Sequence, residues 1–173
     1  MNAALGQIGV WLGFAAALAG AGVLGVSLWR AAHPGRGGPA LDGRLFAPVV
    51  LLGALVAVAA MEHALVAHDF SLVFVADNNS RATPLLYSVT GLWSALAGSI
   101  LLWALALAVY LNVVVWRYRR QADEPAVTWA TVVMYLVAAF FFGLMTGPAN
   151  PFVTEPAGVV SRGLGPNALL QDN

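Results

Sequence analysis

The chain has 173 residues, of which 60% are hydrophobic and 9% are charged, and its formal net charge is zero. Soluble globular domains carry roughly a quarter charged residues, so this composition excludes an ordinary soluble domain and indicates a membrane protein. A neutral chain lacks the positive charge that nucleic-acid binding requires, and the absence of cysteine excludes disulfides and thiol chemistry.

Four apolar stretches are long enough to cross the hydrocarbon core of a bilayer, which takes roughly 20 helical residues. They are predicted over Ala4–Leu28, Leu45–Ala67, Leu92–Trp116 and Ala126–Thr146. Uninterrupted apolar runs favour helices, because a helix satisfies its own backbone in lipid. The predicted fold class is therefore an all-α polytopic membrane protein. A four-helix membrane domain is expected in residues 1–146 and a Pro/Gly-rich tail in residues 147–173.

The first span is interpreted as a retained transmembrane helix, because no cationic region precedes it and it exceeds a signal-peptide core. It carries small residues at four-residue spacing: Gly13, Ala17, Ala21 and Gly25. Such a stripe lets a second membrane helix approach closely. An alanine-rich composition also produces such stripes by chance, so both interpretations stay open.

The second span begins near Pro48, where a missing N–H is tolerated, and ends among Glu62, His63 and His68. Intramembrane carboxylates usually have a partner or line a wet cavity, and Glu62 is alternatively a near-interface group bonded to His63 or to the following loop. A bis-histidine haem needs one imidazole on each side of the iron, whereas helical residues five apart point about 140° apart. The two histidines therefore form no complete haem or metal site by themselves.

The next segment links the second and third spans. Residues 70–76 form a short apolar run that favours a strand or a segment on the membrane surface, and residues 77–80 have turn chemistry. Thr83 and Pro84 resemble an N-cap followed by the first helical residue, so the third helix is expected to start at Pro84 and continue past Gly91. Its apolar side chains are costly to leave in water, so this segment is expected to pack on its neighbours.

The positions of the arginines predict the orientation in the membrane. Six of the eight lie between the first and second spans or between the third and fourth: Arg30, Arg36, Arg44, Arg117, Arg119 and Arg120. Loops rich in arginine stay in the cytoplasm. Both termini, the polar loop 68–91 and the tail are therefore predicted to lie outside the cytoplasm (N-out/C-out).

Several short motifs occur in a defined order between residues 69 and 172. They comprise Asp69 and Phe70, Asn78, Pro84 and Tyr87, Trp93, Gly98 and Ser99, Trp103, residues 150–152, and Gln171 and Asp172. In order, spacing and hydropathy they resemble the amino-terminal part of CcmF in the CcmF/CcsA haem-handling family of cytochrome c maturation proteins. The resemblance covers about residues 45–173.

The resemblance implies a multi-pass protein of the bacterial plasma membrane that helps to present haem to apocytochrome c. It implies haem as the cofactor and further maturation subunits as partners, beside the lipid bilayer. The family resembles a cytochrome c haem lyase component, but no catalytic residue is identifiable in this chain. The motif residues are instead expected to dock a partner.

The sequence departs from the family pattern in two ways. The family commonly has Gly-x-His-Glu-Gly-Ser after the tryptophan, whereas residues 94–99 read Ser-Ala-Leu-Ala-Gly-Ser. The family's His-Pro-Pro and tryptophan-rich segments are also expected beyond Asn173, as in a truncated chain or a split protein with a downstream carboxy-terminal partner. Haem is therefore not predicted to bind stably to this chain alone.

Two other functions stay open on the sequence. Glu62 and His63 in a wet cavity would suit a small membrane transporter or channel subunit. A structural anchor of a respiratory complex would need only the four helices. The sequence leaves open which partner subunits bind and whether the chain is active alone.

The arginine distribution yields a topology prediction. Reporter fusions at Arg36 and Gln121 should be active only with a cytoplasmic reporter, and fusions at Ser80 and Gly158 only with an exported one. A cytoplasmic Ser80 would reverse the predicted orientation.

Overall fold

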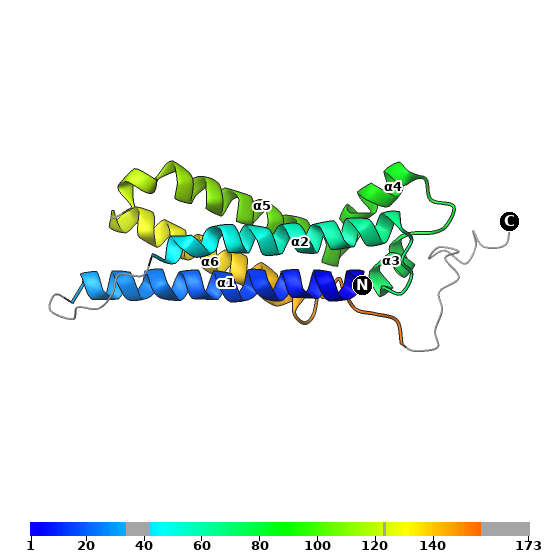
Figure 1. Ribbon diagram of the computed structural model, residues 1–173, viewed down its shortest axis with the longest axis horizontal. Coiled ribbons are helices and arrows are strands. Elements are labelled where there is room, and N and C mark those ends of the chain that lie inside the picture. Colours follow the sequence, from blue (N-terminus) through cyan, green and yellow to red (C-terminus); the bar gives the residue numbers. More distant parts are fainter. Residues whose placement is uncertain (34–41, 123, 157–173) are drawn as a thin grey trace.

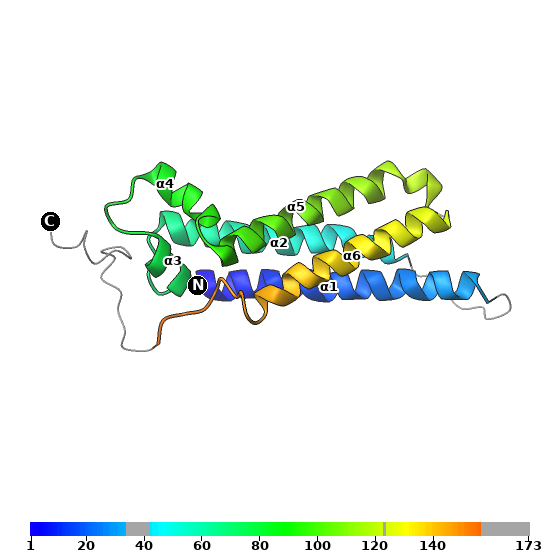
Figure 2. The ribbon, with the colours of Figure 1, turned by 180° about the vertical axis from the view of Figure 1, so that it is seen from behind.

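Four long helices form the membrane part of the structure, a computed structural model that describes residues 1–33, 42–122 and 124–156. They are α1 (Asn2–Ala31), α2 (Ala47–Val66), α5 (Leu96–Arg117) and α6 (Pro125–Met145). Helix α1 packs against α2 and α6, and α5 packs against the same two helices, so the four form a bundle (Figures 1 and 2). Each is long and apolar enough to cross a membrane, which confirms the predicted all-α, four-span class.

Shorter helices lie at the two ends of the bundle (Figure 1). They are the 3₁₀-helices η1 (Gly43–Phe46), η2 (Gly91–Trp93) and η3 (Arg119–Gln121), and the α-helices α3 (Val73–Asn78) and α4 (Leu85–Thr90). Helices α3 and α4 lie at the end that carries the amino terminus, here called the N-terminal end. Helix α1 has 30 residues and is about 45 Å long, so it exceeds the thickness of the hydrocarbon core.

Aromatic rings pack on glycines at seven-residue intervals along α1. A Cβ atom added at Gly6, Gly13 or Gly20 would lie 2.0, 2.4 or 2.5 Å from the ring of Phe152, Phe142 or Tyr135 respectively. Seven residues make nearly two helical turns, so the three glycines share one face. Tyr135 and Phe142 are also seven apart and fully buried, so α6 presents its rings at the matching spacing.

Glycine also brings α1 and α2 into backbone contact. A Cβ atom on Gly53 would lie 2.6 Å from the backbone nitrogen of Gly13 and 2.7 Å from the carbonyl oxygen of Gly9. Of the predicted small-residue stripe, Gly13, Ala17 and Ala21 are buried in the bundle. Gly25 is not part of the contact, because no atom lies within 4 Å of its Cβ position.

The segment after α2 differs from the prediction for residues 70–80. Of the two alternatives for this run, the strand is reduced to one antiparallel bridge between Leu72 and Thr154, and Val73–Asn78 is helical. Asp77 and Asn78 therefore end a helix instead of forming a turn; the Asn78 amide donates to the Phe74 carbonyl at 2.9 Å. Leu72 and Phe74 are buried, which confirms that the segment packs on its neighbours.

The third span does not run unbroken past Gly91, contrary to the prediction. Helix α4 begins at Leu85, one residue after the predicted start, and the backbone is extended at Ala95 before α5 begins. Two serine hydroxyls donate to backbone carbonyls that would accept from backbone N–H groups in a continuous helix. Ser94 donates to the Gly91 carbonyl at 2.6 Å, and Ser99 donates to the Trp93 carbonyl at 3.2 Å. Side-chain bonds of this kind compete with the helical ladder and favour a break.

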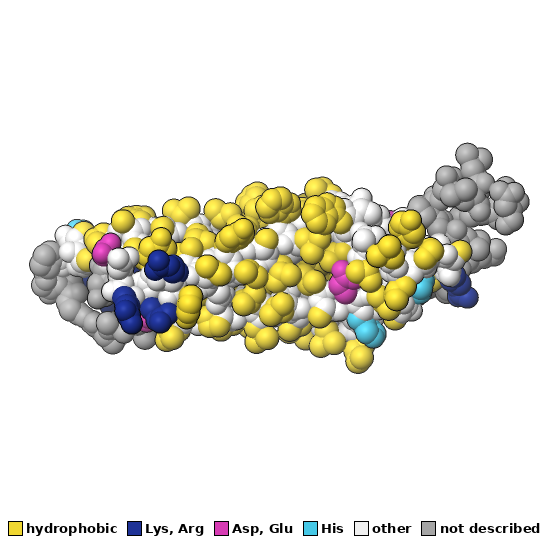
Figure 3. Space-filling view, turned by 90° about the horizontal axis from the view of Figure 1, so that it is seen from above, with side chains coloured by type: hydrophobic (Ala, Val, Ile, Leu, Met, Phe, Trp, Pro, Cys, Tyr) yellow, Lys and Arg dark blue, Asp and Glu magenta, His cyan; other side chains and the backbone are white. Residues whose placement is uncertain are grey.

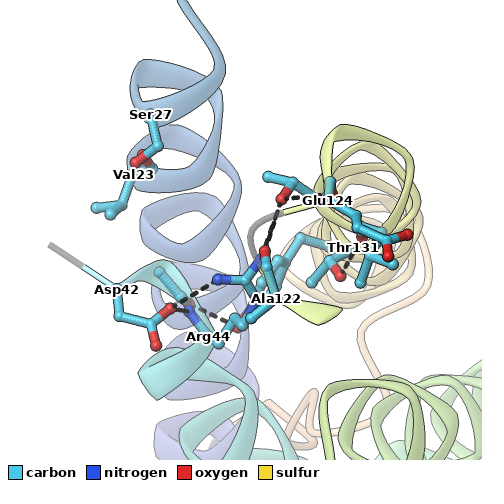
Figure 4. A network of polar contacts seen from close by, with 11 residues as sticks. Val23, Ser27, Asp42, Arg44, Ala122, Glu124 and Thr131 are labelled. Carbon is cyan, nitrogen blue, oxygen red and sulfur yellow. Dashed lines mark hydrogen bonds and ion pairs between the residues drawn. The ribbon is translucent and has the colours of Figure 1, made fainter. Parts of the chain in front are cut away.

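Arg44 joins three segments at the opposite end of the bundle (Figure 4). Its guanidinium donates to the Ala122 carbonyl and, at 3.0 Å, to the Thr128 hydroxyl. The same group lies 3.5 Å from the Asp42 carboxylate. Nearby, the Tyr135 hydroxyl donates to the Gly43 carbonyl at 2.8 Å, so the start of α2 is fastened to the α5–α6 loop and to α6.

The close approach of α1 and α2 yields a stability prediction. Gly53→Leu should lower the free energy of unfolding by about 1–3 kcal/mol or more, because the new side chain would meet backbone atoms that cannot move aside. Gly22→Leu is the matched control, since its Cβ position is open, and it should cause no loss. Thermal unfolding of both variants in detergent tests this; equal effects would contradict the packing argument.

Candidate functional site at the N-terminal end of the bundle

A polar network joins the start of α1 to the end of α2. The side-chain amide nitrogen of Asn2 donates to the Asp69 carboxylate at 2.8 Å. The side-chain oxygen of Asn2 lies 3.0 Å from Nδ1 of His63. Because an amide oxygen only accepts, His63 carries its proton on Nδ1 in this bond. Asn2 is 8% exposed, so a buried amide holds the carboxylate and the imidazole in fixed positions.

Asp69 is held in its ionised form by the groups around it. The Ser71 hydroxyl donates to the carboxylate at 2.5 Å, and this bond is the main cause that lowers the pKa of Asp69. Partial burial opposes it, while the Asn2 amide, the Ser71 backbone and the amino-terminal charge lower the pKa further. Hydrogen bonds to the charged form explain the direction.

His68 ends α2 in a strained conformation. Its φ of 52° lies in the left-handed region, and the Asp69 N–H donates to the Ala64 carbonyl at 2.9 Å, as in a Schellman motif. Glycine usually occupies this position, so the histidine carries backbone strain. Its Nε2 atom is enclosed and has no hydrogen-bond partner within the described part of the chain.

Asn79 fastens α2, α3 and α4 together. Its amide donates to the Leu65 carbonyl at 2.8 Å, a carbonyl in the last turn of α2 that also accepts from the His68 N–H at 3.3 Å. Its side-chain oxygen accepts from the Ser80 backbone at 2.9 Å and from the Ser88 hydroxyl at 3.3 Å. Asn79 and Ser88 are 2% and 1% exposed, so these bonds are shielded from water.

The predicted motif residues around the helix break form one cluster. The Ser94 hydroxyl lies 3.3 Å from the Asn78 side-chain oxygen, so the end of α3 meets the break. Gly98 is buried, and a Cβ atom there would lie 2.0 Å from the Leu92 carbonyl oxygen and 2.7 Å from the Phe74 ring. Only glycine allows α5 to begin this close to η2.

The other predicted motif residues are separate from this cluster. Asp69 belongs to the Asn2 network, Phe70 packs beside the His68 ring with centroids 6.0 Å apart, and Pro84 directly precedes α4. Tyr87, Trp93 and Trp103 are 65%, 77% and 62% exposed, and we call these three the exposed aromatic residues. Gln171 and Asp172 lie outside the described residues.

Sequence reasoning missed Asn2, Asn79 and Ser88. Asn2 was the only polar side chain ahead of a long apolar run, which is a weak signal. Glu62 is half-buried and forms no hydrogen bond or ion pair in the described ranges, so the expected bond to His63 or to the loop is absent there. His63 is bonded to Asn2 instead.

The histidines do not form a haem site within the described residues. His63 has only Nε2 left for a metal, because Nδ1 is bonded to Asn2. His68 cannot offer Nε2 to an iron without moving, since that atom is enclosed. No group of three histidine, cysteine or acidic side chains in the described part of the chain could hold a metal ion. A haem would therefore find at most one axial ligand here.

Several known proteins are similar to this chain, although no protein-family model matches it. The cytochrome c-type biogenesis protein CcmF of Escherichia coli is 31% identical over 86% of this chain and 24% of its own length. CycK of Rhizobium meliloti is 35% identical over 79% of this chain and 20% of its own. The solved structure of the cytochrome c haem lyase CcmF matches with a TM-score of 0.74 and 34% identity over 91% of this chain and 26% of that one.

The fold and these matches indicate a bacterial polytopic membrane protein whose homologues are named cytochrome c-type biogenesis proteins. The chain is homologous to part of the proteins named CcmF and CycK, at 28–35% identity over most of its length. It spans between 16% and 24% of the length of the curated relatives it matches. The resemblance drawn from the motif residues is thereby confirmed.

The Asn2 network yields a pH prediction. Because the pKa of Asp69 is lower in the folded state, its stabilisation is present above the ordinary value of 3.8 and is lost as the pH falls through the folded-state pKa. Asp69→Asn should lower stability by about 1 kcal/mol at pH 7, and this loss should shrink as the pH is lowered below 3.8. Thermal unfolding over a pH series that starts at 7 tests this. Asp77→Asn is the control; a loss in Asp69→Asn that does not change with pH would contradict the assignment.

Proposed function

We propose that this chain is a membrane scaffold of a cytochrome c maturation system. It would act with other maturation subunits, and together they would present haem to apocytochrome c outside the plasma membrane. The observation that carries the proposal is the match of nearly the whole chain to part of a haem lyase structure. The chain would contribute the fold and a docking surface, and the chemistry would reside in the partner.

The docking surface is proposed at the exposed aromatic residues. Tyr87 and Trp93 lie on α4 and η2, outside the long helices, and are more than half exposed. Tyrosine and tryptophan are enriched in protein interfaces, where large rings are buried with little loss of side-chain entropy. Trp103 lies on α5 two turns after its start and extends this surface towards the bilayer.

The N-terminal end of the bundle is proposed to face away from the cytoplasm. Arg81 is the one arginine between α2 and α5, whereas Arg30, Arg44 and η3 lie at the other end. This segregation supports the N-out/C-out orientation and the prediction that the tail from residue 147 lies outside. The described part of that tail packs on the bundle: Phe152 is 4% exposed against Gly6.

The proposal predicts that this chain alone forms no bis-histidine haem complex and that a partner restores haem binding. The purified 173-residue chain should show no stoichiometric bis-histidine haem spectrum, because Nδ1 of His63 is bonded to Asn2 and Nε2 of His68 is enclosed. Co-expression with a partner that carries the tryptophan-rich segment should give a haem-containing complex. A bis-histidine spectrum from this chain alone, lost in His63→Ala, would overturn the proposal.

The docking surface is tested in the same complex. Trp93→Ala should reduce co-purification of the partner by about tenfold or more, which is the usual effect of truncating an interface tryptophan. Trp129→Ala on α6 is the matched control, because that ring is 58% exposed on another helix. Equal losses in the two variants would refute the assigned surface.

A further inference from the structure

Three arginines surround a cavity at the other end of the bundle, where α5 ends. The cavity has a volume of about 410 Å³ and is lined by Trp116, Arg117, Arg119 and Arg120. We call these four residues the basic cluster. Figure 3 shows several dark blue arginine side chains gathered near one end of the molecule, beyond a mainly hydrophobic middle.

The arginines of the basic cluster lack acidic partners. None of the three guanidinium groups forms an ion pair with any residue that the structure describes, and the exposed side chains retain most of their donors. Arg44, at the same end of the bundle, is different: its side chain is 15% exposed and is engaged by Asp42, Ala122 and Thr128. Arg44 therefore stabilises the fold, whereas the arginines of the basic cluster form no ion pair within the described residues.

Trp116 contacts Arg119 and indicates the depth of the basic cluster in the membrane. The Arg119 guanidinium lies 5.0 Å from the centroid of the Trp116 ring and donates to the Trp116 carbonyl at 3.1 Å. Trp116 is 65% exposed in the last turn of α5. Tryptophan at the end of a spanning helix sits at the level of the lipid headgroups, so the basic cluster lies at the depth of the phosphates.

We propose that the basic cluster binds the phosphate group of an anionic phospholipid in the adjacent leaflet. Guanidinium groups match phosphate oxygens with paired hydrogen bonds, and clustered basic side chains beside a membrane helix recognise anionic headgroups. A lipid is the favoured source because its phosphate is held at this depth by its acyl chains, whereas free phosphate is dilute and screened by salt. The site lies at the end of the bundle opposite the proposed docking surface and does not depend on it.

The test uses the full chain purified in detergent and titrated with lipid by native mass spectrometry. The wild type should bind cardiolipin or phosphatidylglycerol more tightly than phosphatidylcholine. Replacing Arg117, Arg119 and Arg120 together with glutamine should weaken binding of the anionic lipids by roughly a hundredfold, at about fivefold per arginine. The triple lysine variant should retain part of the affinity, because it keeps the charge but loses the paired bonds.

Two controls keep the result interpretable. Arg81→Gln removes one arginine at the opposite end and should leave lipid binding unchanged, and Arg120→Gln alone should weaken it about fivefold even if the triple variant fails to fold. Equal binding of anionic and zwitterionic lipids would overturn the proposal, as would unchanged binding in Arg120→Gln. Displacement of the lipid by millimolar inorganic phosphate would identify a site for soluble phosphate instead.

Discussion

The fold depends on the absence of side chains along one face of α1. Large rings from α6 and from the segment after it occupy the space above Gly6, Gly13 and Gly20. Close packing of this kind holds helices together in lipid. Lipid tails are as apolar as a partner helix, so hydrophobic burial gives no free-energy gain when two helices associate. Tyr135 extends the effect, because the ring that fits over Gly20 also places its hydroxyl on the Gly43 carbonyl. The α1–α6 contact thereby fixes where α2 begins.

The N-terminal end of the bundle depends on two buried asparagines. Asn2 holds Asp69 and His63 against the start of α1, and Asn79 holds the last turn of α2 beside α4. An amide both donates and accepts, so one side chain satisfies several backbone and side-chain groups that the membrane helices leave unpaired. Without these bonds the short helices α3 and α4 would have few fixed contacts, since six-residue helices are not stable alone.

The sequence was sufficient for the spans and insufficient for the contacts between them. Length and hydropathy predict each long helix, because lipid imposes the same requirement on every residue of a span. The break at Ala95 was not predictable, since it depends on two serine hydroxyls and on the fit of Gly98 against Phe74, which is remote in sequence. The bond between Asn2 and Asp69 joins residues 67 apart, and no local pattern indicates it. Local propensity also predicted a turn at Asp77, where tertiary packing extends a helix.

The motif residues that resemble the CcmF family separate into two groups on physical grounds. Asn78, Gly98 and Ser99 shape the helix break, so the fold alone requires them. Tyr87 and Trp93 leave more than half of each side chain exposed. The break forms here with leucine and alanine at residues 96 and 97, where the family pattern stated above has histidine and glutamate. A scaffold role requires the first group to build the end of the bundle and the second to present it to a partner.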